Sequence, residues 1–252
     1  MDAMNLCGKI FFNYIPEQFK KMKEYRIKSV QDIFNFFRRY RRSTYWKFRG
    51  HSIAEWKLIP STGRDPFKHI SDAELFNSWK VRAVAYLENY NYSDWDMLAI
   101  AQHNGLPTRL LDWSSNPLIA AFFTVINDIE EDGAIYAHYT KFMINESTHP
   151  PFSSKIKKNM RYRPRAVSRR IINQFGYFTY HVNPAREMTS KNTYGEIEKI
   201  IIPAKIKQDT VFALNQFGIN YLTIYPDLEG LSRQLSWHSA NSKFWSSALH
   251  DD

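Results

Sequence analysis

A turn-rich polar segment that runs directly into an apolar helix constrains this chain more than any other feature. Residues 103–117 read HNGLPTRLLDWSSNP, and the apolar run LIAAFF follows at 118–123. The segment combines an imidazole, a guanidinium, a carboxylate, hydroxyls and an indole, whereas a loop that only connects two elements needs none of them. Asn116 before Pro117 is typical of a helix start. The sequence therefore predicts a polar site held at the beginning of a buried helix.

Local signals along the chain favour an α+β fold. Helices are expected after the capping residues Ser29, Ser71, Ser93 and Asn116, over 208–217, and after Pro226. Strands are expected at 45–48 (ending at Arg49-Gly50), 134–139, 177–182, 197–202 and 221–225. Because helices gather early and strands late, the pattern predicts a mixed or antiparallel sheet with N-terminal helices.

The domain organisation follows from the same patterns. We expect an N-terminal helical segment, residues 1–44, packed on a core, and one domain over 45–245. A stretch at about 141–165 has no periodicity and contains Pro150-Pro151. It is predicted to be a long basic loop.

Composition narrows the class of protein. Hydrophobic residues make up 44% and aromatic residues 16% of the 252 residues, which excludes a disordered chain. The aromatic residues exceed what a core of this size needs, so some are expected to line a pocket. The single cysteine, Cys7, excludes an internal disulfide. With no secretory pattern and no apolar run near the roughly 20 residues that span a bilayer, we expect a soluble cytoplasmic protein without membrane contact.

The net charge of +9 is unevenly placed. No acidic residue interrupts a basic run between Lys155 and Arg170, which consists of Lys155, Lys157, Lys158, Arg161, Arg163, Arg165, Arg169 and Arg170. Such a run attracts polyanions, so a nucleic acid or a protein acceptor is one expected partner. The alternative interpretation is a solvated basic loop with no partner.

Four blocks of sequence resemble a known family. In order they read FRGHSIAEWKLIPSTGRD, AQHNGLPTRLLDWSSNPLIAAFF, RIINQFGYFTYH and YPDLEGL, and they span about Ser43 to Trp237. They are similar to the FRG-domain family, named for the Phe-Arg-Gly that stands here at Phe48, Arg49 and Gly50. The resemblance carries no specific reaction with it.

A smaller set of residues is similar to ADP-ribosyltransferases of the arginine–serine–glutamate type. These enzymes have an early strand arginine, a Ser-Thr-Ser strand and a late Glu-x-Glu. Arg49, Ser114-Ser115 and Glu196-Ile197-Glu198 occur here in that order. The chain departs from the pattern because it lacks the Ser-Thr-Ser triplet. The similarity implies an ADP-ribosyltransferase-like fold, NAD as substrate, and a transferase or NAD glycohydrolase acting as a toxin or defence effector, for example against phage.

That similarity implies a role for each candidate residue. Arg49 would hold phosphate and ribose oxygens, and Ser114 would orient the ribose. Glu198 would stabilise the oxocarbenium-like centre that forms when the nicotinamide bond breaks, and Glu196 would activate an acceptor. The residues expected around the nucleotide are Arg49, His103, Thr108, Arg109, Asp112, Trp113, Ser115 and Tyr177, with Trp113 or Tyr177 stacking on a ring.

Structural roles compete with each of these assignments. Arg49 can form a salt bridge to Asp112, and Arg109 can pair with the same carboxylate. Glu196 and Glu198 can be the solvent-facing start of a strand, and Trp113 can belong to the core. His103 can be an ordinary loop histidine, and Gln174 beside Gly176 a turn-stabilising amide.

Two further functions remain open. The first is a nucleic-acid-binding module or metal-independent ribonuclease that uses the basic loop, with His103, Arg109 and Asp112 as acid–base groups. The second is a nucleotide sensor without catalysis. No Cys/His spacing supports zinc, no acidic cluster supports magnesium, and neither a phosphate-binding glycine loop nor GxGxxG occurs. No metal is therefore expected.

Overall fold

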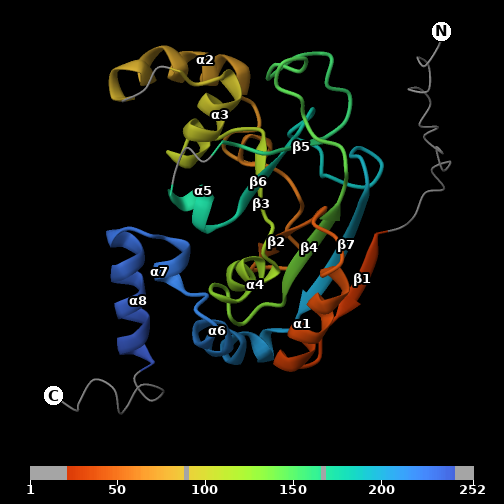
Figure 1. Ribbon diagram of the computed structural model, residues 1–252, viewed down its shortest axis with the longest axis vertical. Helices are drawn as coiled ribbons and strands as arrows, with labels where there is room; N and C mark the ends of the chain where they lie inside the picture. The colour runs from red at the N-terminus through yellow and green to blue at the C-terminus, as the bar shows by residue number, and fades with distance from the viewer. Residues whose placement is uncertain (1–21, 88–90, 166–168, 242–252) are drawn as a thin grey trace, which may run out of the picture.

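A seven-stranded mixed sheet forms the centre of the protein (Figure 1). The structure is a computed structural model and describes residues 22–87, 91–165 and 169–241. The strands are β1 (Lys23–Arg26), β2 (Trp46–His51), β3 (Leu110–Ser114), β4 (Gly133–Tyr139), β5 (Met160–Tyr162), β6 (Gly176–Tyr180) and β7 (Glu196–Ile202). Their order is β1-β7-β4-β2-β3-β6-β5; β1 is parallel to β7, and the other neighbours are antiparallel. The predicted α+β class is confirmed.

Helices complete the fold. The α-helices are α1 (Val30–Phe37), α2 (Asp72–Ala83), α3 (Asp94–His103), α4 (Pro117–Val125), α5 (Arg169–Asn173), α6 (Lys207–Gln216), α7 (Tyr221–Ile224) and α8 (Leu228–Ala240). Short 3-10 helices occur at Arg38–Tyr40, Ser61–Gly63, Val84–Tyr86 and Ala204–Ile206. In the described ranges, none of these helices is long and apolar enough to cross a membrane.

Helices cover one face of the sheet. On the half formed by β1, β7, β4 and β2, buried side chains such as Phe48, Ala137 and Ile200 pack with α1, α4 and α6. On the half formed by β3, β6 and β5, Leu110 and Phe178 pack with α2 and α3. Since side chains alternate along a strand, these strands present a different set of residues to the opposite face.

Loops cover that opposite face. Trp113, Tyr136 and Ile197 pack there against Leu58 and Met188, which lie in two irregular segments. The Met188 amide donates a hydrogen bond to the Leu58 carbonyl oxygen at 2.9 Å, which joins the two segments. The result is a sheet with helices on one side and long, polar-rich loops on the other, and these loops provide walls for a cleft.

The four capping residues expected from the sequence begin helices as expected. The side chains of Ser29, Ser71, Ser93 and Asn116 accept hydrogen bonds from backbone amides in the first turns of α1, α2, α3 and α4. These contacts satisfy amide groups that have no partner within the helix. Local sequence therefore determines where these helices start.

Several expectations about elements were wrong. Residues 221–225, expected as a strand, contain helix α7, which Asn220 caps through the Thr223 amide. The expected loop at about 141–165 contains the strand β5, and the turn-rich segment at 103–117 contains the strand β3. Within 1–44, residues 1–21 lie outside the described part, and the strand β1 at Lys23–Arg26 was not predicted.

The glycine of the Phe-Arg-Gly motif allows a helix to pack directly on the sheet. A Cβ atom at Gly50 would lie 2.0 Å from the Ala120 carbonyl oxygen and 2.9 Å from the Thr124 amide nitrogen, both in α4. Backbone atoms cannot rotate away as a flexible side chain can. Only glycine therefore permits this approach of β2 and α4.

We expect Gly50→Ala to lower the free energy of unfolding by about 1–3 kcal/mol because α4 must move away from β2. Urea denaturation monitored by tryptophan fluorescence measures the change. Gly176→Ala is the matched control, since its Cβ would meet its nearest neighbour at 3.3 Å and so needs a much smaller adjustment. Equal stability losses in the two variants would contradict the account of Gly50.

Candidate functional site

The neighbouring strands β2 and β3 make very little contact with each other. β2 pairs with β4 along its whole length, from Trp46 to His51, but with β3 only through Phe48 and Ser114. Space therefore opens between β2 and β3 beyond both ends of this single pair. One of these spaces is a cleft of about 1080 Å³, here called the Arg49 cleft, whose lining includes Arg49, His51, Trp56, Arg64, Asp112 and Trp113.

The three residues of the Phe-Arg-Gly motif make different contacts. Phe48 is 3% exposed and packs in the core under α1 and α4. Arg49 lines the cleft, and Gly50 contacts α4. Because successive residues of a strand point to opposite faces, Phe48 and Arg49 can serve the core and the cleft at the same time.

The Arg49 guanidinium is held by two neighbours. Its Nε donates to His51 Nε2 at 2.9 Å, and its Nη1 donates to the Asp112 carbonyl oxygen at 2.8 Å. The Asp112 Oδ2 atom lies farther from Nη1, at 3.5 Å. Among the described residues, Nη2 has no hydrogen-bond partner, and the side chain is 19% exposed. The guanidinium therefore keeps donor capacity that faces the cleft.

His51 is a neutral, fixed side chain. Since an arginine Nε is always a donor, His51 Nε2 must accept, and its Nδ1 then donates to the Trp56 carbonyl oxygen at 3.1 Å. Burial, together with the positive charge of Arg49, lowers the pKa of His51 to about 3. His51 therefore orients Arg49 and does not exchange protons near neutral pH.

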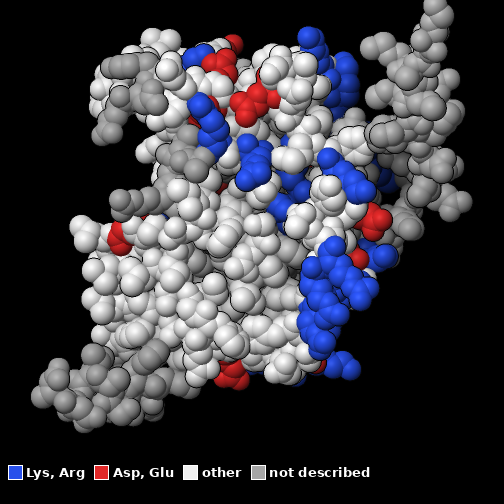
Figure 2. Space-filling model, viewed as in Figure 1, with Lys and Arg blue, Asp and Glu red and all other residues white. Residues whose placement is uncertain are grey.

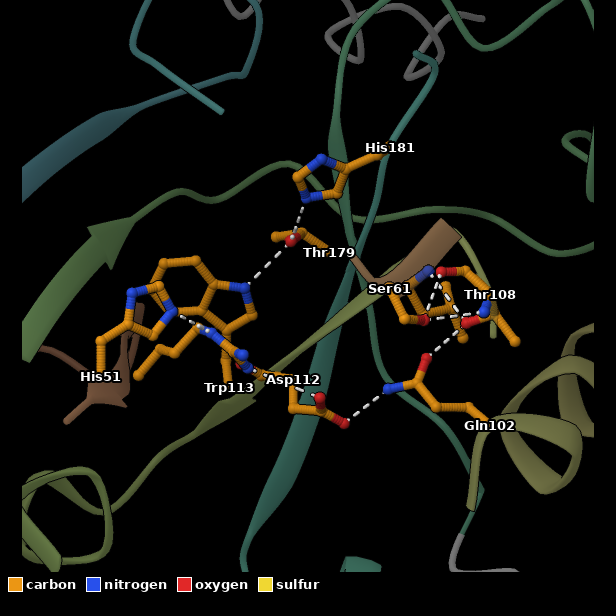
Figure 3. Close-up of polar contacts among 10 residues, drawn as sticks. His51, Ser61, Gln102, Thr108, Asp112, Trp113, Thr179 and His181 are labelled. Carbon is orange, nitrogen blue, oxygen red and sulfur yellow. Dashed lines mark hydrogen bonds and ion pairs between the residues drawn. The ribbon is translucent and has the colours of Figure 1, made fainter. Parts of the chain in front are cut away.

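A chain of hydrogen bonds fixes the Asp112 carboxylate (Figure 3). Gln102 Nε2 donates to Asp112 Oδ1 at 2.6 Å, and Thr108 Oγ1 donates to Gln102 Oε1 at 2.5 Å. Ser61 Oγ accepts from the Thr108 amide at 3.1 Å. The chain connects β3, the end of α3 and the short helix at Ser61–Gly63, so three separate segments hold one carboxylate at the cleft.

The Trp113 indole is a wall of the cleft and does not present a free face. It is 3% exposed, and its Nε1 donates to Thr179 Oγ1 at 2.9 Å (Figure 3). Thr179 Oγ1 in turn lies 3.2 Å from His181 Nε2. The exposed aromatic ring at the cleft is Trp56, at 48%.

Charges of both signs line the Arg49 cleft. The cations are Arg49, Lys57 and Arg64, and the carboxylates are Glu55, Asp112 and Asp128. Asp128 also accepts from Ser52 Oγ at 2.5 Å. A ligand suited to this lining offers an anionic group to the guanidinium groups and hydroxyl donors to the carboxylates.

Comparison with known families identifies the segment that builds this cleft. Residues 44–133 match the family model of the FRG domain. The chain contains an FRG domain. No curated protein and no solved structure matches the chain significantly. The resemblance read from the sequence is thereby confirmed for its first two blocks, while the third and fourth lie beyond the matched residues.

The FRG domain supplies most of the cleft. Its matched residues run from the turn before β2 to the first residue of β4 and include α2, α3, β3 and α4. Gln174 and Tyr225, which also line the cleft, come from segments after the match. The β1, β5, β6 and β7 strands likewise lie outside it and complete the sheet.

The structure does not bring the four proposed catalytic residues, Arg49, Ser114, Glu196 and Glu198, together. Glu198 shares a row across the sheet with Ala137 and Phe48, which places its side chain on the helical face, opposite to Arg49. Its Oε2 accepts from the Tyr40 hydroxyl at 2.7 Å, and its Oε1 lies 3.6 Å from Arg39. Neither Glu198 nor the exposed Glu196 lines the Arg49 cleft. The predicted convergence is therefore wrong.

Ser114 lines the cleft but is engaged in local structure. It is 5% exposed, its Oγ donates to the Gln174 carbonyl oxygen at 2.7 Å, and it accepts from the Asn116 amide at 3.0 Å. These bonds shape the turn from β3 into α4. Ser114 therefore positions the helix start and has no hydroxyl proton left for a ligand.

The remaining candidates lie in several places. Ser115 and Tyr177 line a second cavity, described below. His103 is exposed at the end of α3, and Thr108 is buried in the chain that fixes Asp112. Arg109 forms a two-point ion pair with Asp72, so the expected pairing of Arg109 with Asp112 is wrong. Arg109 precedes the first residue of β3, and the partner that donates to Asp112 Oδ1 is Gln102.

The basic run does not form one surface. Arg161 is 2% exposed, Arg165 pairs with Asp96, and Arg170 pairs with Asp227 and Glu229. Residues 166–168 lie outside the described part. The described side chains of the run therefore have separate environments and do not form one exposed cationic surface. Over the ranges that the structure describes, no group of three His, Cys, Asp or Glu side chains is placed to hold a metal ion.

Several residues of the cleft were missed at the level of sequence. His51, Trp56, Lys57 and Arg64 all lie in the first FRG block. Their signal was the density of polar and aromatic residues in an irregular stretch directly after a strand. Gln102 lies one position before the polar segment, and only the folded arrangement shows that its amide bridges Thr108 and Asp112.

Proposed function

We propose that the protein is a nucleotide-binding module and that its ligand, NAD or another ribonucleotide, lies in the Arg49 cleft. The observation that carries the proposal is a guanidinium with unused donors beside a fixed carboxylate. Arg49 lines the cleft, its Nη2 has no hydrogen-bond partner among the described residues, and Asp112 Oδ2 lies 3.5 Å from its Nη1. Phosphate oxygens suit the guanidinium fork, and ribose hydroxyls suit the carboxylate.

The dimensions and walls of the cleft support this class of ligand. Its volume of about 1080 Å³ is at the upper end of ordinary ligand sites, so a nucleotide fits within it. Trp56 offers an exposed indole at the rim for the base, and Arg64 adds a second cation. Arg49 itself stays charged because arginine is not deprotonated in proteins, although burial lowers its pKa.

Binding without turnover is the form of the proposal that the side chains support. His51 is neutral with both ring nitrogens engaged, and Ser114 is committed to backbone contacts. Glu198 lies on the other face of the sheet. Of the carboxylates that line the cleft, Asp112 lies 3.5 Å from Arg49 Nη1, so it is the first candidate for a catalytic role there.

We expect Arg49→Lys to weaken NAD or ADP-ribose binding about 10- to 100-fold, since it removes the two-point fork while keeping the charge. Asp112→Asn should also weaken binding, because it removes the carboxylate that accepts hydrogen bonds from the ribose hydroxyls. Isothermal titration calorimetry of the purified chain measures both. Arg82→Ala is the control, because the Arg82 guanidinium donates to Ser78 within α2 and does not line the cleft.

Two results would overturn the proposal of a nucleotide site. It fails if NAD, ADP-ribose and AMP all show no binding to the unaltered chain, or if Arg49→Lys and Asp112→Asn, shown folded by thermal melting, bind as tightly as the unaltered chain. Release of nicotinamide from NAD, measured in parallel, separates binding from turnover. Release that is lost in Asp112→Asn and retained in Glu198→Gln would make the module an enzyme.

A further inference from the structure

A second cavity opens at the other end of the single β2–β3 contact. It has a volume of about 740 Å³ and is called here the Lys47 cavity. Its lining includes Lys47 from β2, Arg161 from β5, Tyr177 from β6, and the flanking residues Arg41, Arg163 and Ser115. The Arg49 cleft and the Lys47 cavity therefore share the strands β2 and β3 but differ in their side chains.

The lining of the Lys47 cavity is cationic. Lys47, Arg41, Arg161 and Arg163 contribute to it, and no Asp or Glu does. This differs from the Arg49 cleft, where carboxylates and cations are mixed. Lys and Arg side chains also gather on the adjoining surface over α1 and continue toward β5, as Figure 2 shows. An anion approaching this side of the protein meets a positive potential.

Two of these cations are buried and have no carboxylate partner in the described part of the chain. Lys47 is 4% exposed and donates to the carbonyl oxygens of Thr44, at 2.5 Å, and Trp46, at 3.1 Å. Carbonyl oxygens satisfy hydrogen-bond donors, but they do not neutralise a positive charge.

Arg161 is held in the same way. It is 2% exposed, its Nη1 donates to the Tyr45 carbonyl oxygen at 2.7 Å, and its Nη2 donates to the His138 carbonyl oxygen at 2.8 Å. Burial and the neighbouring charges of Arg161 and Arg163 lower the pKa of Lys47 to about 8. Burial also lowers the pKa of Arg161 to about 10. The fold thus maintains two unneutralised charges beside an open cavity.

An aromatic ring forms part of the same wall. Lys47 Nζ lies 4.4 Å from the centre of the Tyr177 ring, and the Arg163 guanidinium carbon lies 5.9 Å from it. Cation–π contacts of this kind offset part of the charge but leave the cavity positive. We propose that the Lys47 cavity is a binding site for a phosphate monoester or pyrophosphate group, with Lys47, Arg161 and Arg163 as its cationic ligands.

A small phosphorylated ligand is favoured over a nucleic acid because the buried cations lie in a recessed cavity. The rest of the basic run is paired or distributed, as Arg165 with Asp96 and Arg170 with Asp227 show. A track for a long polyanion needs accessible cations in sequence along a groove. A compact dianion needs two or three cations close together, and Lys47, Arg161 and Arg163 line this one cavity.

The test is calorimetric titration of the purified chain with inorganic pyrophosphate. We expect saturable binding that Lys47→Met weakens about 10- to 100-fold and Arg163→Gln weakens by a smaller factor. Lys68→Met, which removes an exposed lysine paired with Asp65, is the charge-matched control and should leave binding unchanged. Pyrophosphate binding that Lys47→Met weakens more strongly than Arg49→Lys does separates this site from the Arg49 cleft.

Defined results would overturn the inference. No saturable binding of pyrophosphate to the unaltered chain, or equal affinities for the unaltered chain, Lys47→Met and Arg163→Gln, would do so. If Lys47→Met does not fold, the exposed Arg163 still provides the test. Binding of a single-stranded oligonucleotide without binding of pyrophosphate would replace the small ligand with a nucleic acid. Loss of pyrophosphate binding in Arg49→Lys alone would assign it to the Arg49 cleft.

Discussion

Lowering the pH from 7 to 5 is expected to reduce the free energy of unfolding by several kcal/mol. Three buried histidines, His51, His138 and His181, are 6%, 0% and 0% exposed. Burial is the main cause that lowers the pKa of each from 6.5 to about 3, and neighbouring arginines add to it. All three are therefore neutral in the folded state at pH 5.

The sign of the effect follows from proton binding. The unfolded chain binds protons at these histidines with a pKa near 6.5, whereas the folded chain resists protonation until about pH 3. Their contribution to stability is complete above pH 6.5 and is lost as the pH falls through the window between those values. At pH 5 each histidine accounts for roughly 2 kcal/mol, since one pKa unit is about 1.4 kcal/mol.

Urea denaturation at several pH values between 7.5 and 5 measures this dependence. Replacing His181 with Asn is expected to make the dependence shallower by about one third, because one of three similar contributions disappears. His69 is exposed, so His69→Asn is the control and should leave the slope unchanged. A free energy of unfolding that stays constant from pH 7 to pH 5 would contradict the neutrality of the three buried side chains.

Breaking the ion pair between Arg109 and Asp72 should destabilise the fold by about 3–5 kcal/mol. Arg109 Nη2 and Nε donate to the two carboxylate oxygens at 2.5 and 2.6 Å, and the side chains are only 15% and 8% exposed. The guanidinium also lies 4.7 Å from the centre of the Phe152 ring. Removing one partner leaves the other charge buried without compensation.

Asp72→Asn and Arg109→Met are the variants to compare, by the shift in the denaturation midpoint at constant slope. The double variant should lose less than the two single losses added together, because it leaves no unpaired charge. Lys68→Met, which removes an exposed ion pair with Asp65, serves as control and should change stability by less than about 1 kcal/mol. Strictly additive losses in the double variant would show that the pair does not act as a unit.

Elements with strong local signals were predictable from the sequence. The side chains of Ser93 and Asp96 form a capping box at the start of α3, and Asn116-Pro117 starts α4. Such contacts are made within three residues, so they need no knowledge of the fold. The helix α7 was missed although its capping residue, Asn220, makes a contact of the same kind. Its aromatic and β-branched residues favoured a strand on propensity alone.

Elements that depend on distant partners were not predictable. The β1 strand is a short, mostly exposed KEYR segment that gains its hydrogen bonds from β7, over 170 residues later in the chain, with Lys23 opposite Glu198. Nothing in its own pattern indicates a strand. Pairing of this kind is determined by the rest of the sheet.

The same distinction applies to the site. Local sequence predicted that Arg49 ends a strand and that the segment containing Asp112 forms a polar site. Arg49 and Asp112 do line one cleft. The error concerned Glu198, whose order along the chain matched the expected pattern while its position across the sheet did not. Side-chain direction in a strand changes with every residue, so linear order cannot decide which face a carboxylate occupies.

The single residue pair between β2 and β3, Phe48 with Ser114, affects how the sheet is held together. It divides the sheet into a four-stranded part, β1-β7-β4-β2, and a three-stranded part, β3-β6-β5, which share little main-chain hydrogen bonding. The α4 helix packs on both parts, Arg49 of β2 donates to the Asp112 carbonyl oxygen of β3, and Arg161 of β5 donates to the His138 carbonyl oxygen of β4. These contacts help to hold the two parts together. A ligand bound on either side of the Phe48–Ser114 pair would contact both parts of the sheet. Its binding or release would therefore change how strongly the two parts are held together.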